Sequence, residues 1–209
     1  MNRRTGFRAL GWLGLATMIA SFSVGPGEAQ SLSGAALANA LRQGGYVLVM
    51  RHANSPAQPP DKADADAANV KLERQLDAAG REAARSMGEA VKALRIPIGD
   101  VLSSPTYRAL QTVNLASLGK AKTFPELDEG AAGMQGSAEG SRVAWLKAEI
   151  GQAPRPGTNS IVVTHAPNIK DSFGIDAAAG ETLVFRPDGK GGATQIARIK
   201  IGDWPSLGK

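Results

Sequence analysis

Cysteine is absent from the 209-residue sequence, and aromatic residues make up only 5% of it. Without thiols the chain cannot form a disulfide, a thiolate nucleophile, a zinc–thiolate site or a lipidated N-terminal cysteine. The scarcity of aromatics, and the lack of a basic stripe interleaved with them, argue against nucleic acid as a partner. Stability must therefore come from packing, and a chain of this length with 43% hydrophobic residues can form one globular domain.

The N-terminal 29 residues have the pattern of a secretory signal. Three arginines lie within the first eight residues, an uncharged run covers residues 9–24, and small residues precede Ala29. This pattern predicts a signal peptide over residues 1–29, cleaved after Ala29, and a periplasmic or secreted protein. An uncleaved anchor is the alternative, although the run is short for a bilayer span of about 20 residues. After cleavage we expect no stable membrane association, and the formal net charge falls from +5 to +3 because three arginines and one glutamate leave.

Residues 30–209 alternate between predicted strands and predicted helices. Continuous apolar runs predict buried strands, while capped or amphipathic segments predict helices. A Gly-rich hairpin turn separates two further strands near the C-terminus. The alternation predicts an α/β protein, a three-layer sandwich with a mostly parallel central sheet. The predicted strands cover 46–50, 100–104, 160–165 and two parts of 181–201; the predicted helices cover 34–43, 76–96, 105–119 and 141–151; loops cover 53–71 and 120–140.

Both histidines of the sequence follow apolar runs of predicted strands. His52 comes after Arg51 at the end of the first strand, and His165 ends the run that begins at residue 160. Because ligands of parallel α/β sheets bind beyond the carboxyl ends of the strands, we expect these side chains at one mouth of the fold. A transition-metal site is an alternative for two histidines. No third histidine, cysteine or close carboxylate cluster joins them at ligand spacing, so we predict no metal.

Five segments of the chain follow one another in the order typical of a known family. They read VMRHANSP, LDAAGREAA, SSPTYRALQTV, LDEGAAG and VVTHAPNI. This order resembles the histidine phosphatase superfamily, branch 1, with its phosphoglycerate-mutase-like fold. The Arg-His pair and the Ser-Ser-Pro run are the most specific parts, and the resemblance covers nearly all of residues 30–209. It implies a histidine phosphatase domain over this range that uses neither a metal nor a cofactor.

The resemblance also implies roles for four side chains. His52 matches the family nucleophile, which attacks phosphorus in line and forms a phosphohistidine. The attacking ring must be neutral, with a backbone carbonyl holding the Nδ1 proton and Nε2 free. Arg51 and Arg108 match pocket arginines, whose planar guanidinium groups suit bidentate phosphate contacts. His165 matches the second histidine and completes the pocket as another donor.

The proton donor for the leaving group is expected in residues 127–133, which resemble the family segment L-x-E-x-x-x-G. Glu129 occupies the glutamate position and is the candidate general acid, with Asp171 as the fallback. Glu129 is equally open to a reading as a solvated loop carboxylate, because the segment lacks the aromatic residues usual there. Asn54 and Ser104 are candidates for secondary phosphate contacts, although both residue types also serve as turn or cap residues after strands.

Three residues next to the histidines depart from the family pattern. Ala53 and Ala166 stand where a glycine normally follows each histidine, so we expect a methyl group where the backbone lies close to phosphate. Pro167 is expected to remove a further backbone donor from the loop. The larger acid-phosphatase and phytase branch is disfavoured, because its His-Asp pair is absent and the chain has little room for the inserted helical domain.

These features predict an exported phosphomonoesterase that hydrolyses a small-molecule phosphate ester through a phosphohistidine. Its alternative is a catalytically silent phosphate- or anion-binding module on the same fold, which the two alanine replacements favour. A mutase is disfavoured, because bisphosphorylated primers belong to the cytosol. Substrate specificity is expected to lie in the loops 53–71 and 120–140.

Overall fold

The computed structural model describes Met1, residues 31–129 and residues 137–209. The predicted signal peptide and the glycine that ends the predicted acid segment lie outside these residues. Within the described ranges, none of the helices has the length and apolar character needed to cross a membrane.

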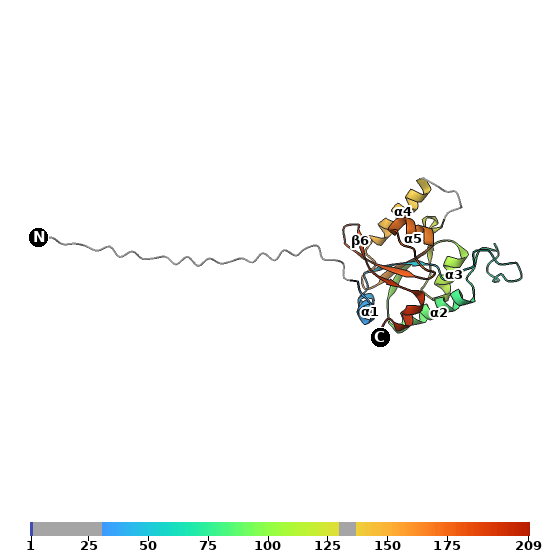
Figure 1. Cartoon of the computed structure of the whole chain (residues 1–209), viewed down its shortest axis with the longest axis horizontal. Helices are drawn as coiled ribbons and strands as arrows, with labels where there is room; N and C mark the ends of the chain where they lie inside the picture. The colour runs from blue at the N-terminus through green and yellow to red at the C-terminus, as the bar shows by residue number, and fades with distance from the viewer. Residues whose placement is uncertain (2–30, 130–136) are drawn as a thin grey trace.

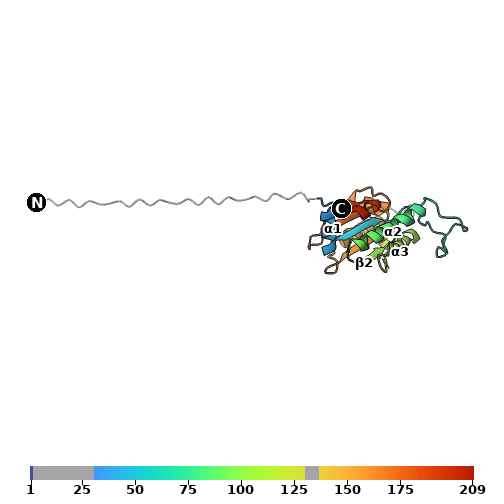
Figure 2. The ribbon, with the colours of Figure 1, turned by 90° about the horizontal axis from the view of Figure 1, so that it is seen from below.

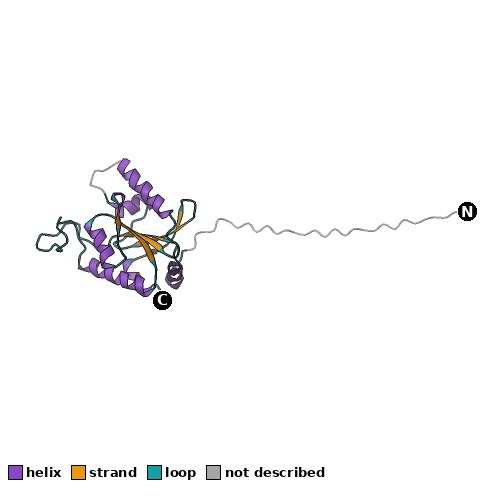
Figure 3. Cartoon of the chain, turned by 180° about the vertical axis from the view of Figure 1, so that it is seen from behind, coloured by secondary structure: helices purple, strands orange, loops and turns teal. Residues whose placement is uncertain are grey.

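A six-stranded sheet forms the middle layer of the protein (Figures 1 and 3). Its strands are β1 (Val47–Arg51), β2 (Ile98–Ser103), β3 (Lys122–Thr123), β4 (Asn159–Thr164), β5 (Thr182–Pro187) and β6 (Ala193–Ile199). They lie in the order β3-β2-β4-β1-β5-β6. The first four in this order are parallel to one another, whereas β5 runs antiparallel to both β1 and β6. The predicted α/β sandwich with a mostly parallel sheet is therefore confirmed.

Helices cover both faces of the sheet. One face packs against α1 (Gly34–Gln43), α2 (Ala78–Ala93), α3 (Tyr107–Leu115) and the 3₁₀ helix η2 (Ile201–Ser206), and Figure 2 looks onto this side. The other face packs against α4 (Ser137–Ile150), α5 (Ala166–Phe173) and the 3₁₀ helix η1 (Pro125–Leu127).

The central strand β1 shows why the sheet needs both layers. Leu48 and Met50 point into the first core, and Val47 and Val49 point into the second. All four are at most 1% exposed. Because successive side chains of a strand point to opposite faces, a continuous apolar run of this kind is stable only when both faces are covered.

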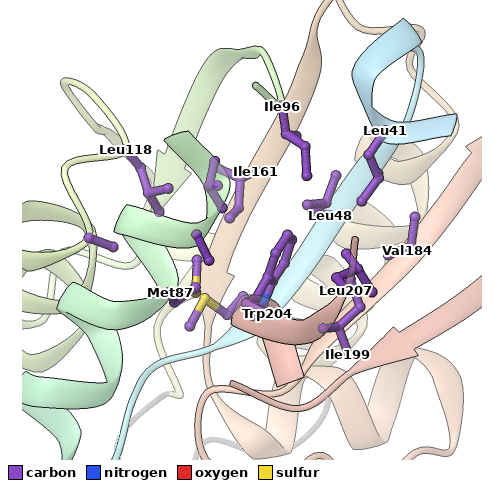
Figure 4. Close-up of a cluster of buried hydrophobic side chains, with 14 of the residues drawn as sticks. Leu41, Leu48, Met87, Ile96, Leu118, Ile161, Val184, Ile199, Trp204 and Leu207 are labelled. Atoms are coloured by element: carbon purple, nitrogen blue, oxygen red, sulfur yellow. The ribbon is translucent and has the colours of Figure 1, made fainter. Parts of the chain in front are cut away.

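The C-terminal helix η2 closes the first core. Trp204 is fully buried there, close to Met87 of α2 and Leu207, as Figure 4 shows. η2 packs directly against α2. A fully buried aromatic side chain contributes several kcal/mol, on the order of 3–5 kcal/mol when it is lost to alanine.

The long segment between β1 and α2 has turns but no helix or strand over residues 53–71, as predicted. It is held on α3. Gln111 accepts a hydrogen bond from Leu76 N at 2.7 Å and donates one to Asp66 Oδ2 at 2.5 Å. Glu73 Oε2 accepts from Tyr107 N, the first amide of α3, at 2.9 Å. These bonds fix the loop against the same helix that carries Arg108.

Some element boundaries differ from the predicted ones. α3 begins at Tyr107 rather than at residue 105, because Thr106 has the extended backbone of an N-cap. α4 begins at Ser137, inside the predicted loop 120–140, which also contains β3 and η1. α5 directly follows His165 and was not predicted.

Candidate active site

The two histidines meet at the carboxyl ends of parallel strands. β4 lies between β2 and β1, and Arg51 is in register with Thr164. His52 N donates to Thr164 O at 3.0 Å, which continues the ladder by one residue. The imidazole rings of His52 and His165 lie edge to face, with centroids 5.2 Å apart. The structure therefore brings together the two rings that the sequence placed at separate strand ends.

Arg108 joins the two rings. Its Nε donates to His52 Nε2 at 3.2 Å, and its Nη2 lies 3.1 Å from His165 Nδ1. The side chain comes from the first turn of α3 and is only 4% exposed. Since a guanidinium is a donor only, both facing ring nitrogens act as acceptors here.

His52 is held as a neutral ring with Nε2 facing the site. Its Nδ1 lies 2.7 Å from Ala53 O, and a carbonyl can only accept, so Nδ1 carries the proton. Burial is the main cause that lowers the pKa of His52 to about 4. The bond to Ala53 O opposes this shift, while the charges of Arg108, Arg51 and Arg74 add to it. At neutral pH the ring is uncharged, with a lone pair on Nε2.

His165 is the more deeply buried of the two rings. Burial, followed by the charge of Arg108, lowers its pKa to about 2. Its Nε2 lies 2.9 Å from Ser104 Oγ and 3.4 Å from Thr106 Oγ1. The sequence suggested Ser104 as a secondary phosphate contact, but in the structure its hydroxyl bonds to His165.

Glu129 lies at the edge of this cluster and is about one-third exposed. Its Oε1 accepts from Arg108 Nη2 at 2.5 Å, and its Oε2 is 3.6 Å from His165 Nδ1. The structure thus places the candidate acid beside the pocket, and not in open solvent.

The backbone that precedes Glu129 is fixed by two buried side chains. Thr164 Oγ1 donates to Leu127 O at 2.8 Å. Asn168 Nδ2 lies 3.2 Å from Glu126 O and 3.1 Å from Asp128 O, and donates to both. Thr164 ends β4 and Asn168 lies in α5, so the strand and helix that flank His165 also position the acid segment. Sequence reasoning missed Asn168, although it lies within the quoted motif VVTHAPNI.

Arg51 and Asn54 have different surroundings. Arg51 Nη1 donates to Ala177 O at 2.9 Å, and its charge lowers the pKa of both histidines, so its guanidinium lies close to the site. Asn54 Nδ2 instead donates to Asp77 Oδ2 at 2.6 Å. Asp77 also caps α2 by accepting from Gly80 N. The structure therefore ties Asn54 to the start of α2, and within the described residues its side chain makes no hydrogen bond to either ring.

Arg74 is a third arginine at the site that sequence reasoning missed. Its Nε donates to Pro56 O at 2.7 Å, and its Nη1 lies 3.8 Å from Glu129 Oε1. Its charge contributes to the lowered pKa of both histidines. The available signal was its place two residues before the motif LDAAGREAA, shortly after the loop 53–71 that was expected near the mouth.

Two of the departures from the family pattern have clear surroundings in the structure. Ala53 is fully buried and packs with Leu76 and Ala84, so its methyl group belongs to the core. Pro167 lies in the first turn of α5 and not in a loop. It has no backbone N–H to donate, but no intrahelical donor is needed at this position.

Among the other acidic side chains of the described residues, Asp128 also lies near the site, with its Oδ1 3.9 Å from His165 Nε2. Asp171, the fallback acid, is exposed on α5. Across residues 31–129 and 137–209, no group of three histidine or carboxylate side chains is arranged to hold a metal ion.

The fold and the site together define an α/β protein whose sheet mouth gathers neutral imidazoles and guanidinium groups, side chains that are suited to binding an oxyanion. The profile of the histidine phosphatase superfamily (branch 1) matches residues 47–161, more than half of the chain. The chain therefore belongs to this superfamily, and the resemblance found in the sequence is confirmed.

Solved structures with the same fold include the following three proteins. The protein histidine phosphatase SixA, complexed with tungstate, has a TM-score of 0.55 at 20% identity and covers 76% of this chain and 98% of its own. A mutant phosphoserine phosphatase from Entamoeba histolytica, in complex with phosphoserine, has a TM-score of 0.53 at 12% identity. The match covers 75% of this chain and 97% of the phosphoserine phosphatase chain. YhfR from Bacillus stearothermophilus has a TM-score of 0.52 at 14% identity, and the match covers 72% of this chain and 94% of the YhfR chain. None of the curated proteins matches the chain significantly.

Proposed function

We propose that this protein is an exported, metal-independent phosphatase that hydrolyses a small-molecule phosphate monoester through a phosphohistidine at His52. Membership of the histidine phosphatase superfamily supports phosphatase activity. The observation that carries the mechanism is the bridge of Arg108 between His52 Nε2 and His165 Nδ1. This bridge holds the nucleophilic nitrogen, a second imidazole and a buried guanidinium side by side in one site.

The first step is attack by His52. Ala53 O holds the Nδ1 proton, so the Nε2 lone pair is directed into the site. Nε2 forms a bond to phosphorus while the bond from phosphorus to the ester oxygen breaks. Arg108 Nε, which donates to Nε2 in the free site, gives up this bond when the phosphoryl group enters.

Charge on the transferring phosphoryl group is stabilised by the surrounding donors. Arg51 and Arg108 supply guanidinium groups that stay charged at every working pH, and His165 supplies a further ring. Donors fixed before the reaction cost no reorganisation in the transition state. Loss of one such donor is expected to reduce the rate by about 10² to 10³.

Glu129 serves as the general acid and then as the general base. It gives a proton to the departing ester oxygen, so that a neutral alcohol leaves. In the second step it takes a proton from the water that attacks the phosphohistidine, which releases phosphate and restores His52. Its contact with Arg108 and its distance of 3.6 Å from His165 Nδ1 support this position.

The experiment is phosphate release from an aryl phosphate by the purified protein in the presence of a chelator. We expect turnover by the wild type, none by His52→Ala, and an acid-labile phosphoryl group trapped on His52. Arg155→Ala is the control for Arg108→Ala, because Arg155 pairs with Asp100 at the opposite end of the sheet. Activity that survives in His52→Ala, or that the chelator abolishes, would refute the mechanism.

The second candidate is an anion-binding module without turnover. The bond between Glu129 and Arg108 favours it, since a carboxylate already lies on the cation that a phosphate would use. Tight binding of vanadate with no hydrolysis of any ester would support this candidate. The ester panel should include phosphoserine, and a phosphohistidine-bearing protein should be tested beside it, because the structural neighbours are named for these groups.

Export is the part of the proposal that depends on residues 1–29. The support is the order of arginines, uncharged run and small residues in the sequence. Cell fractionation followed by mass measurement should find a chain beginning at residue 30 outside the cytoplasm. A full-length cytoplasmic protein would contradict it.

A further inference from the structure

We infer that Ser104 is a positioning residue whose hydroxyl accepts from His165 Nε2 in the free site and reverses this hydrogen bond when phosphate binds, which allows the proton of His165 to appear on Nδ1. Only the second half of this inference, the reversal of the hydrogen bond on phosphate binding, rests on the proposed function. The first half concerns the free protein and stands independently of turnover.

The free site fixes one tautomer. Arg108 Nη2 is a donor, so His165 Nδ1, at 3.1 Å, must offer a lone pair. A neutral imidazole has one N–H, which then lies on Nε2. The ring is neutral in this site because its pKa is lowered to about 2. Nε2–H accordingly donates to Ser104 Oγ at 2.9 Å.

The surroundings of Ser104 allow both directions of this bond. Ser104 is fully buried, and its backbone N donates to Val163 O at 2.9 Å, which fixes its place beside β4. Its Oγ accepts from Thr106 N at 3.3 Å and lies 3.1 Å from Thr106 Oγ1. The hydroxyl hydrogen therefore has two acceptors within reach: Thr106 Oγ1 while Nε2 is protonated, and His165 Nε2 when it is not.

A bound phosphate requires the second arrangement. The oxygens of a phosphate dianion accept hydrogen bonds, so a histidine nitrogen that faces them must donate. The nitrogen that faces the pocket is Nδ1, since it shares Arg108 with His52 Nε2. One proton leaves Nε2 and one arrives at Nδ1, both exchanged with water, so the ring stays neutral. Ser104 then turns its hydroxyl and donates to Nε2.

The test is nitrogen NMR of the ring in the full chain, which has only two histidines to assign. In the free wild type we expect the proton of His165 on Nε2, and with saturating inorganic phosphate on Nδ1. Ser104→Ala should show a solvent-exchanging Nε2–H in the free protein and no change of tautomer with phosphate. A fall in kcat/KM of about tenfold or more should accompany it.

The control is Ser103→Ala, which removes an equally buried hydroxyl that donates to Ser104 O and not to His165. It should leave the tautomer unchanged, and Ser104→Thr, which keeps a hydroxyl, should restore the switch. A proton on Nδ1 in the free wild type, or a ring that keeps its Nε2 proton with phosphate bound, would overturn the inference. A normal switch in a protein that hydrolyses no ester would refute the proposed function alone.

Discussion

Arg108 makes hydrogen bonds to two histidine rings, an arrangement that requires both rings to be uncharged. A protonated imidazole would put two cations about 3 Å apart in a buried site, where the repulsion is only weakly screened. Burial resolves the conflict by lowering the pKa of both rings far below neutral pH. The same burial that stabilises the core therefore keeps the nucleophile in its reactive form.

At the residue scale, the role of Glu129 can be tested through the leaving group. Glu129→Gln removes the transferable proton but keeps the shape. We expect a loss of about 10² to 10⁴ in kcat for an alkyl phosphate, whose leaving oxygen needs a proton, and a much smaller loss for a nitrophenyl phosphate. Steady-state kinetics on both esters measures the difference.

Glu126→Gln is the matched control, because this glutamate lies in the same segment and, within the described residues, its side chain makes no hydrogen bond or ion pair with either histidine. It should change neither rate by more than about twofold. Equal losses for both esters in Glu129→Gln would show that Glu129 is structural and not an acid.

At the scale of elements, the buried strands were predictable, whereas the short helix α5 and the short strand β3 were not. β1 and β4 are continuous apolar runs, which leave a clear signal in the sequence. α5 has only eight residues, and its buried face consists of Asn168, Ile169 and Ser172, so it has almost no apolar periodicity. β3 has two exposed residues and forms because it pairs with the edge of β2. This pairing is a tertiary contact, which the local sequence does not reveal.

Gly80 allows the first turn of α2 to touch the loop that follows His52. A Cβ at this position would lie 2.1 Å from Asn54 O, a backbone atom that cannot turn away. We expect Gly80→Ala to destabilise the fold by about 1–3 kcal/mol and to reduce activity, because the loop carries the His52 backbone with it. Urea unfolding and kinetics on the folded protein measure the two effects.

Gly140→Ala provides the control for this substitution. Gly140 also lies in a helix, but no atom lies within 4 Å of its added Cβ among the described residues. Alanine there should stabilise the protein by about 1 kcal/mol and leave kcat unchanged. If both variants behave alike, the close approach of α2 to Asn54 has no role in the site.

Asn168 couples α5 to the acid segment, so its loss should affect turnover as well as stability. Asn168→Leu keeps the volume but removes the bonds to Glu126 O and Asp128 O. Because a misplacement of about 1 Å can cost up to 10²-fold in rate, we expect kcat to fall by 10-fold to 10²-fold. The loss should concern kcat more than KM.

Asn159→Leu removes an equally buried amide at the other end of the sheet, where it binds Leu41 O and Pro97 O. This variant should lower the free energy of unfolding by about 1–3 kcal/mol with kcat unchanged in the folded fraction. A similar kcat for the two variants would argue against a positioning role of Asn168.

At the scale of the whole molecule, the sequence was sufficient for the fold class, and the structure brings together five of the side chains that the sequence singled out: Arg51, His52, Arg108, Glu129 and His165. Parallel strands align their carboxyl ends, so residues that directly follow strands must meet, as His52 and His165 do. Arg74 and Asn168 could not be predicted in the same way, because neither follows a strand and each reaches the site through a loop or helix packed by tertiary contacts. Asn54 follows a strand as well, yet its short side chain is engaged by Asp77.

The lowered pKa values of both histidines predict how stability depends on pH. Unfolded histidine titrates near 6.5, whereas the folded rings have pKa values of about 4 and about 2. Below pH 6.5 the unfolded chain binds protons that the folded chain does not, so stability is lost as pH falls. The slope approaches about 1.4 kcal/mol per pH unit for each histidine near pH 5, and the contribution of His52 decreases towards pH 4, where its folded ring also becomes protonated.

Urea unfolding from pH 7 to pH 4.5 measures this slope. A variant with asparagine at both histidine positions should have a nearly flat dependence between pH 6.5 and pH 5. A slope that persists in that variant would assign the effect to carboxylates.

The position of β1 in the sheet has a consequence for the newly made chain. Its neighbours on either side, β4 and β5, begin more than a hundred residues later. Until β4 and β5 have been synthesised, Val47–Arg51 has no strand to pair with on either side. Structure that forms before then is confined to local helices. The sheet cannot form until Asn159–Thr164 and Thr182–Pro187 have been synthesised, which gives chaperones a long interval in which to hold an unfolded polypeptide.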